Sequence, residues 1–360
     1  MRRIAALIVY GLSVACSGPM SNTSAEPNTR EPEAEREVSF ASDGMTLEGT
    51  LYVPASNGSV PVIVLVHGSG PHSRRYSLTG QLNVNFGFEL DVFDELAKSL
   101  HAAGFAVLTY DKRTCGRFNN CAENAYPEPS EGTSLQEFAG DVMAAVAFLR
   151  TQDGLGSIHV VGHSQGAELA LWALSENNTD IASAVLLAVP FEPVDVILED
   201  QLQSTRDLLN RAGTEPSQIQ ALTRPTDSIV QGLANLRDDS SSNIAVGGAS
   251  AEFWRSWMAI GESRESQLAA VERPLLIVHG TADTTINEKQ SELWRQASTE
   301  HSEVSTVRLS CISHALNCLE KSDPLELSLG DISRHVDSQI VEAITSFFRS
   351  TKTMPPGVRR

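Results

Sequence analysis

Short apolar segments alternate along the chain with segments in which apolar residues recur at helical spacing. Runs of strand length occupy residues 38–41, 47–53, 60–66, 106–110, 158–161, 184–189, 275–279 and 304–309. Helical spacing marks the segments around 93–100, 138–149, 169–174 and 340–348. The run at 60–66 is almost continuously apolar, as expected for a strand covered on both faces. The alternation predicts an α/β fold: a mostly parallel central sheet flanked by helices.

One long segment does not follow this alternation. Residues 191–270 are polar, with apolar positions at helical spacing, and they fall between two predicted strands. We predict that they form an inserted helical cap over the carboxyl ends of the strands, where ligands usually bind in open α/β sheets. The main α/β domain then comprises residues 38–190 and 271–350.

The first residues have the organisation of an export signal. Arg2 and Arg3 precede an apolar run that ends at Val14. A short positive head followed by a short apolar segment is typical of a signal peptide, here predicted as residues 1–15. The run is too short to cross a hydrocarbon core of ~30 Å as a helix. We therefore expect an exported protein of the periplasm or cell envelope.

Cys16 lies where a bacterial lipoprotein carries its acylated cysteine. The preceding residues resemble a lipobox, although Leu12 is one position farther from the cysteine than in the usual pattern. The alternative is an ordinary cleaved signal followed by an incidental cysteine. Residues 16–37 contain almost no large apolar side chains and predict a disordered tether. Together these features predict a lipoprotein whose membrane contact is made through its lipid.

The net charge of the chain argues against some classes of binding partner. Among 360 residues, Lys and Arg number 27 and Asp and Glu number 45, so the formal net charge is −18. Such a surface repels phosphate backbones, and nucleic-acid binding is not expected. The same charge disfavours adsorption to anionic lipid head groups. Nothing in the sequence indicates a protein partner.

The chain has five cysteines. If Cys16 is modified, Cys115, Cys121, Cys311 and Cys318 remain, and an even number in an oxidising compartment predicts two disulfides. Four cysteines allow three pairings, of which the simplest joins Cys115 to Cys121 and Cys311 to Cys318. The alternative is four buried thiols. Metal-binding CxxC spacing is absent, so no zinc site is predicted.

The strongest chemical signal is the sequence Gly-His-Ser-Gln-Gly at residues 162–166. It matches G-x-S-x-G, follows a predicted strand and opens a predicted helix, the context in which this motif presents a nucleophile. Small residues at 162 and 166 allow the tight turn that holds Ser164 clear of the backbone. A serine hydroxyl is a weak nucleophile and needs a neighbouring base. The alternative is a plain glycine-rich turn between strand and helix.

Further motifs follow other predicted strands: His-Gly-Ser-Gly-Pro at 67–71, Tyr-Asp-Lys-Arg at 110–113, His-Gly-Thr-Ala-Asp at 279–283, and Ser-His at 313–314. With the serine motif, the set resembles the α/β-hydrolases, in particular the dienelactone-hydrolase-like and serine-aminopeptidase-like serine hydrolases. The resemblance extends over about residues 38–349. It is specific for the fold and only weakly specific for substrate.

The resemblance implies a catalytic triad of Ser164, Asp283 and His314, in the family order of nucleophile, acid and base. It also implies an oxyanion hole made by the backbone N–H groups of Ser69 and Gln165. Two other histidines follow Asp283, but His301 and His335 lie among charged residues and are expected at the surface.

The resemblance assigns structural roles to several other residues. We expect His67, His163 and His279, each at a strand end, to tie loops together. Lys112 and Arg113 are expected to anchor a loop by ion pairing. Many relatives have a glycine directly after this arginine, whereas here Thr114 and Cys115 precede Gly116 and the loop 117–133 is long, which leaves the local loop geometry open.

The implied function is hydrolysis of a small-molecule ester through an acyl-enzyme, with no metal or organic cofactor. One alternative is a peptidase or thioesterase that uses the same triad. A second alternative is a surface lipoprotein that keeps the fold for binding without catalysis. The three triad residues, in family order, argue against the second alternative.

Overall fold

The computed structural model describes residues 34–75, 91–115, 133–176, 180–321, 323–328, 331 and 335–351. The predicted signal peptide, Cys16, most of the predicted tether and Cys121 lie outside these residues. Export and lipid attachment therefore stay predictions.

The described residues form an eight-stranded sheet with the order β1-β2-β4-β3-β5-β6-β7-β8. β2 runs antiparallel to both of its neighbours, and the strands from β4 to β8 are parallel. The strands are β1 (Ala34–Ser42), β2 (Met45–Val53), β3 (Val60–Val66), β4 (Ala106–Tyr110), β5 (Leu155–His163), β6 (Ile181–Leu187), β7 (Leu275–Gly280) and β8 (Val304–Leu309). All seven residues of β3 are buried, because the strand lies inside a sheet that is covered on both faces. The predicted α/β class is confirmed.

β1 begins earlier than expected. Its first residue, Ala34, pairs with Val53, so residues 34–37 belong to the sheet and not to the predicted tether. Glu35 and Glu37 are exposed on this edge strand, so the segment lacks the apolar pattern that would have marked it as a strand. These residues form a strand because they pair with β2.

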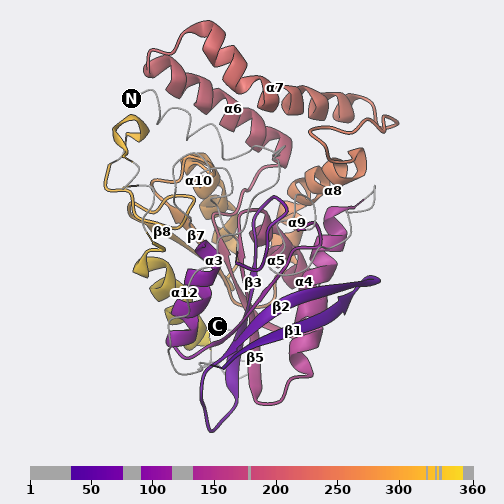
Figure 1. Ribbon diagram of the computed structural model, residues 1–360, viewed down its shortest axis with the longest axis vertical. Coiled ribbons are helices and arrows are strands. Elements are labelled where there is room, and N and C mark those ends of the chain that lie inside the picture. Colours follow the sequence, from indigo (N-terminus) through magenta and orange to yellow (C-terminus); the bar gives the residue numbers. More distant parts are fainter. Residues whose placement is uncertain are drawn as a thin grey trace, which may run out of the picture.

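Helices cover both faces of the sheet (Figure 1). α3 and α12 pack on one face, and α4, α5 and α10 contribute to the larger core on the other. Their bounds are α3 (Val92–Ala102), α4 (Leu135–Arg150), α5 (Gln165–Ser175), α10 (Glu288–Ala297) and α12 (Ser338–Thr351), with 3-10 turns at Ser298–Glu300 and Pro324–Glu326. α4 starts at a capping box in which Ser134 and Glu137 satisfy each other's backbone N–H groups.

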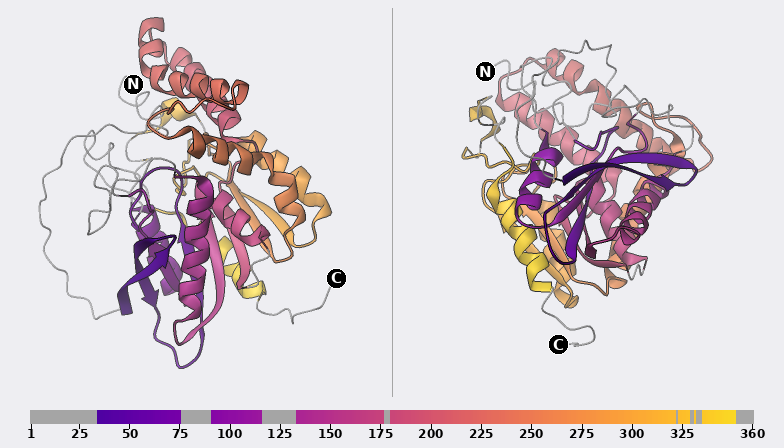
Figure 2. Two further views of the ribbon diagram at one scale, coloured as in Figure 1. Left: turned by 90° about the vertical axis from the view of Figure 1, so that its right-hand side faces the viewer. Right: turned by 60° about the horizontal axis from the view of Figure 1, so that its bottom comes forward.

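Four helices lie between β6 and β7: α6 (Val194–Arg211), α7 (Pro216–Asp238), α8 (Ala251–Glu262) and α9 (Arg264–Ala269). α6 and α7 pack together and project beyond the sheet, whereas α8 and α9 lie closer to the main domain (Figure 2). We refer to these four helices as the cap. Because α6 follows the carboxyl end of β6, the cap leaves the sheet at the edge where parallel strands end.

A buried ion pair joins the cap to the main domain. Arg264, at the start of α9, lies 2.5 Å from a carboxylate oxygen of Glu168 on α5, and both side chains are almost fully buried. The other carboxylate oxygen of Glu168 accepts a hydrogen bond from the indole of Trp257 at 2.6 Å. The guanidinium also donates to the backbone oxygen of Phe191 at 3.4 Å. These contacts hold α8 and α9 against the helix that follows Ser164.

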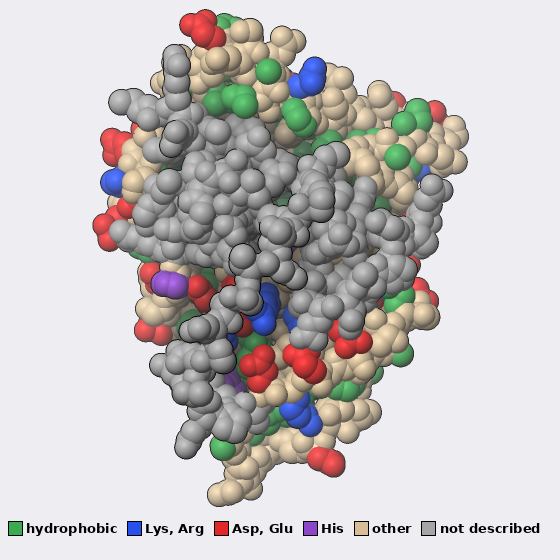
Figure 3. Space-filling view, viewed as in Figure 1, with side chains coloured by type: hydrophobic (Ala, Val, Ile, Leu, Met, Phe, Trp, Pro, Cys, Tyr) green, Lys and Arg blue, Asp and Glu red, His purple; other side chains and the backbone are tan. Residues whose placement is uncertain are grey.

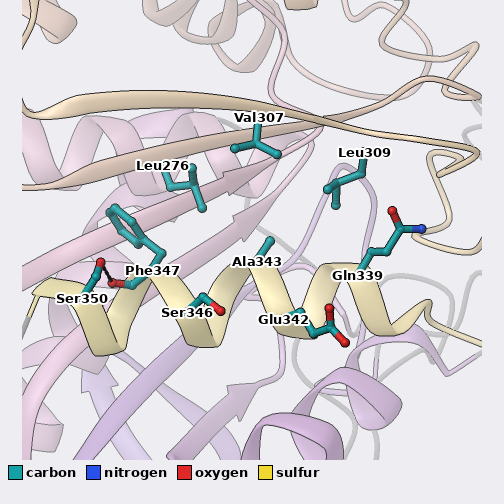
Figure 4. A pocket seen from close by; sticks show the side chains of 9 residues that line it. All are labelled: Leu276, Val307, Leu309, Gln339, Glu342, Ala343, Ser346, Phe347 and Ser350. Atoms are coloured by element: carbon teal, nitrogen blue, oxygen red, sulfur yellow. Dashed lines mark hydrogen bonds between the residues drawn. The ribbon is translucent and has the colours of Figure 1, made fainter.

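The β8 edge of the sheet carries an apolar groove beside α12 (Figure 4). Leu276, Val307 and Leu309 line it from the strands, and Ala343 and Phe347 line it from the helix. None of the predicted site residues lines this groove. Arg308, paired with Glu288 at 2.8 Å, places a charge on the same edge strand. Such charges disfavour edge-to-edge pairing of sheets.

Acidic side chains gather over the β1–β2 hairpin on the face shown in Figure 3. Glu35 and Glu37 are exposed there, and Glu48 is half-buried. This distribution agrees with the negative net charge of the chain.

The Arg264–Glu168 pair gives a stability prediction. Arg264→Met should lower the free energy of unfolding by about 3–5 kcal/mol, because it leaves the Glu168 carboxylate buried without its partner. Urea unfolding followed by tryptophan fluorescence measures the change. Arg295→Met is the matched control, since Arg295 pairs with Glu292 at the surface, where both side chains are about half exposed. Equal effects of the two substitutions would contradict this role for the buried pair.

Candidate active site

The residues predicted for the site follow the carboxyl ends of parallel strands. Ser69 follows β3, Ser164 follows β5, Asp283 follows β7 and His314 follows β8. The carboxyl ends of parallel strands meet at one edge of a sheet, which is where open α/β sheets bind ligands. The sheet topology thus brings residues from four distant segments to one edge.

Ser164 lies on a sharp turn between β5 and α5. Its φ is 55° and its ψ is −122°, a conformation that side chains rarely adopt. A Cβ at Gly162 would lie 2.2 Å from the backbone oxygen of Gly166, and a Cβ at Gly166 would lie 2.1 Å from the backbone oxygen of Val66. Only glycine fits at either position. The two glycines let α5 start against the end of β3, and Ser164 is held at the turn.

Asp283 and His314 form a direct hydrogen bond. The Nδ1 of His314 lies 2.9 Å from Oδ2 of Asp283. The other carboxylate oxygen, Oδ1, accepts the backbone N–H groups of Thr285 and Ile286, each at 2.8 Å. With both oxygens engaged, the carboxylate has a fixed orientation. The bond to Nδ1 leaves Nε2 as the ring nitrogen that can exchange a proton.

The protonation of Asp283 is set by opposing effects. Burial alone would raise its pKa, because a carboxylate loses hydration. His314 and the two backbone N–H groups outweigh this effect, and the pKa lies below its ordinary value. Asp283 is therefore charged at neutral pH and can stabilise a protonated His314.

His163 places the imidazole of His314 beside the serine turn. The two rings are 4.7 Å apart, and the Nε2 of His163 donates to the backbone oxygen of His314 at 2.9 Å. Burial, with a smaller contribution from His314, lowers the pKa of His163 to about 3. His163 is therefore neutral and structural. His279 acts similarly: its Nε2 donates to the backbone oxygen of Val189 at 3.0 Å.

A disulfide closes the loop that carries His314. Cys311 and Cys318, which are seven positions apart in sequence, are bonded as predicted. Two residues of this loop, Cys311 and Leu316, have positive φ values of 61° and 63°. Within the loop, the backbone N–H of Ser313 donates to the backbone oxygen of Asn317 at 2.8 Å. Cys115 is also disulfide-bonded, and its predicted partner Cys121 lies outside the described residues.

The two backbone N–H groups predicted for the oxyanion hole are available. Neither the N–H of Ser69 nor that of Gln165 has a hydrogen-bond partner among the residues that the structure describes. Gln165 is the first residue of α5, so its N–H is one of those that a helix leaves without an internal partner.

Of the two basic residues expected to form ion pairs after β4, one does so and the other does not. Arg113 forms the expected ion pair, with a bidentate contact to Asp141 at 2.6 and 2.8 Å. Lys112 does not: among the described residues, no carboxylate lies within ion-pair distance of its Nζ. Its Nζ instead donates to the backbone oxygen of Gly68 and to the side chain of Gln165. No motif in the sequence indicated these contacts.

The two other histidines that follow Asp283 in the sequence do not belong to the site. His335 pairs with Glu95 at the surface, and His301 is half-buried at the start of the turn before β8. Within the described ranges, no cluster of His, Cys, Asp and Glu could hold a metal ion. In the same part of the chain, no helix has the length and apolar character needed to cross a membrane.

Comparisons with known proteins agree with this architecture. Esterase EstD of Thermotoga maritima is 26% identical over 323 residues, which cover 88% of this chain and 68% of the relative. The structure of Est1E from Butyrivibrio proteoclasticus matches with a TM-score of 0.53 at 16% identity, covering 88% of this chain and 99% of that one. The Pyrococcus horikoshii acylaminoacyl peptidase also matches with a TM-score of 0.53 at 16% identity, over 90% of this chain and 43% of that one. At these identities, the two structures bear on the fold alone.

The family model described as serine aminopeptidase, S33, matches residues 59–316. That range contains Ser69, Ser164, Gln165, Asp283 and His314. It also begins at the first buried parallel strand and includes the cap. The chain therefore belongs to the serine aminopeptidase S33 family of α/β-hydrolases.

Proposed function

We propose that the protein hydrolyses carboxylic esters of small molecules, with Ser164 as nucleophile, His314 as base and Asp283 as the acid that orients it. The observation that carries the proposal is the 2.9 Å bond between Asp283 and His314, on a loop held beside the Ser164 turn by His163. The 26% identity to an esterase supports ester bonds as the target.

The proposed reaction has two steps. His314 Nε2 takes the proton of Ser164 Oγ as the oxygen attacks the ester carbonyl carbon, and it then gives that proton to the leaving alcohol. The same nitrogen next activates a water molecule, which releases the acid and restores Ser164. Charged Asp283 stabilises the imidazolium in both steps. The backbone N–H groups of Ser69 and Gln165 would donate hydrogen bonds to the developing oxyanion.

Peptide hydrolysis is the second candidate. The family description names a serine aminopeptidase, and one structural neighbour is an acylaminoacyl peptidase. The triad could serve either bond, so substrate preference would depend on the cap and the loops. A panel of p-nitrophenyl esters and aminoacyl p-nitroanilides separates the two, and we expect the esters to be turned over faster.

Replacing the nucleophile or the base should abolish most of the activity. Ser164→Ala and His314→Ala should each lower kcat for a p-nitrophenyl ester by about 10⁴-fold or more, because members of a triad act as a unit. Circular dichroism checks that each variant is folded. His301→Ala is the control and should retain wild-type turnover, since His301 is not part of the site. Near-native rates in either triad variant would show that the residues are misassigned.

The disulfide should affect catalysis through the position of His314. In the double variant Cys311→Ser and Cys318→Ser, the loop can relax from its two positive-φ residues, and such backbone persists only when its surroundings hold it. We expect kcat to fall by up to about 100-fold, the cost of misplacing a catalytic group by about 1 Å. Steady-state kinetics on the folded double variant test this, and an unchanged kcat would mean that the hydrogen bonds alone position the loop.

A further inference from the structure

Lys112 is a buried amine beside the proposed oxyanion hole. It follows the carboxyl end of β4, and only 4% of it is exposed. Its Nζ donates to the backbone oxygen of Gly68 at 2.7 Å and to Oε1 of Gln165 at 2.6 Å. The ring of Phe138 lies 4.9 Å from the same nitrogen. One amine group thus connects the loop after β3 with the start of α5.

The contact with Gly68 sets the direction of the Ser69 N–H. The carbonyl of Gly68 and the N–H of Ser69 belong to the same peptide group, which is planar and trans, so they point in opposite directions. Holding the Gly68 oxygen toward Lys112 therefore turns the Ser69 N–H away from Lys112. The next peptide is held in a similar way, because the Nε2 of His72 lies 2.5 Å from the Ser69 oxygen.

The contact between Lys112 and the side chain of Gln165 restrains the residue that supplies the second N–H group of the oxyanion hole. Gln165 is 2% exposed, and its Nε2 has no hydrogen-bond partner among the described residues. Lys112 is thus the group that orients this amide within the described part of the chain. The side chain and the backbone N–H of Gln165 belong to one residue at the first position of α5. Fixing the side chain restricts the start of the helix that supplies the N–H.

We propose that Lys112 is a positioning residue of the oxyanion hole, holding the Gly68–Ser69 peptide and Gln165 so that both backbone N–H groups point to one place. The inference rests on the proposed function, since it assigns a role in the same reaction. Hydrogen bonds in a buried, low-dielectric site are electrostatically stronger than in water, which suits the two bonds of Lys112 to hold two segments in register.

The stability of the folded protein does not explain why position 112 is a lysine. Burial lowers the pKa of Lys112 to about 7, and the more distant Asp141 offsets this only in part. A buried amine without a carboxylate partner is costly to desolvate. A methionine of similar length would fill the same space beside Phe138 without that cost. What distinguishes lysine from methionine at this position is the pair of hydrogen bonds from its Nζ.

The test is Lys112→Met, assayed with a p-nitrophenyl ester and with an aryl trifluoromethyl ketone, which forms an oxyanion-bearing adduct with an active-site serine. We expect kcat per active site to fall by about 10- to 100-fold, below the effect of deleting one oxyanion donor outright, with little change in KM. The affinity for the ketone should fall by a similar factor. Active sites are counted by titration, so that a partly unfolded preparation does not mimic the effect.

The outcomes separate this proposal from the proposed function. If turnover by the wild-type protein does not depend on Ser164, the proposed function fails whatever Lys112 does. If turnover depends on Ser164 but Lys112→Met keeps the wild-type kcat per site and ketone affinity, the role of Lys112 is overturned. Should Lys112→Met fail to fold, Lys112→Gln retains an N–H donor for one of the two acceptors. It should then give reduced kcat and ketone affinity, and wild-type values would equally overturn the proposal.

Discussion

The close approach of α5 to the ends of β3 and β5 is the constraint on which the rest of the site depends. A side chain at Gly162 or Gly166 would overlap backbone atoms of the turn or of β3. Because both positions are glycine, the turn can hold Ser164 at a positive φ and place it at the carboxyl edge of the sheet. That edge also receives Asp283, His314 and the loop after β3. The same approach brings the first N–H of α5 beside this loop.

Buried charges then fix the parts that surround the turn. The Arg113–Asp141 pair anchors the segment after β4 to α4, and the Arg264–Glu168 pair anchors α8 and α9 to α5. Lys112 differs from these arginines because a backbone carbonyl and an amide are its hydrogen-bond acceptors. In our account, the arginines stabilise the architecture, whereas the lysine sets the direction of groups that would contact the transition state. Through the second pair, α8 and α9 are held against the helix that follows Ser164.

Much of this architecture could be predicted from the sequence. Apolar periodicity locates all eight strands, because each buried strand has a continuous or alternating apolar pattern between turns. The serine turn could be predicted because its steric requirement for glycine appears directly in the residues. The early start of β1 could not, since the order of residues 34–37 comes from pairing with β2 and not from their own polar side chains.

Polar contacts between residues that are far apart in sequence could not be predicted either. Glu168 and Arg264 are 96 positions apart, and nothing local to either residue indicates the other. A signal was nonetheless present, because Glu168 is a single charge within the apolar helix Gln165–Ser175, a pattern that indicates a buried partner elsewhere. For Lys112, the neighbouring Arg113 suggested a shared role in ion pairing. The two side chains in fact leave in different directions, toward Gly68 and toward Asp141.

The most direct test of the central claim, that Asp283 and His314 activate Ser164, is labelling of the purified protein with a fluorophosphonate. Peptide mass spectrometry would then locate the modified residue. We predict a single label on Ser164, lost when His314 is replaced by alanine in a folded protein. A folded wild-type protein that takes up no label, or one labelled on another residue, would contradict the account.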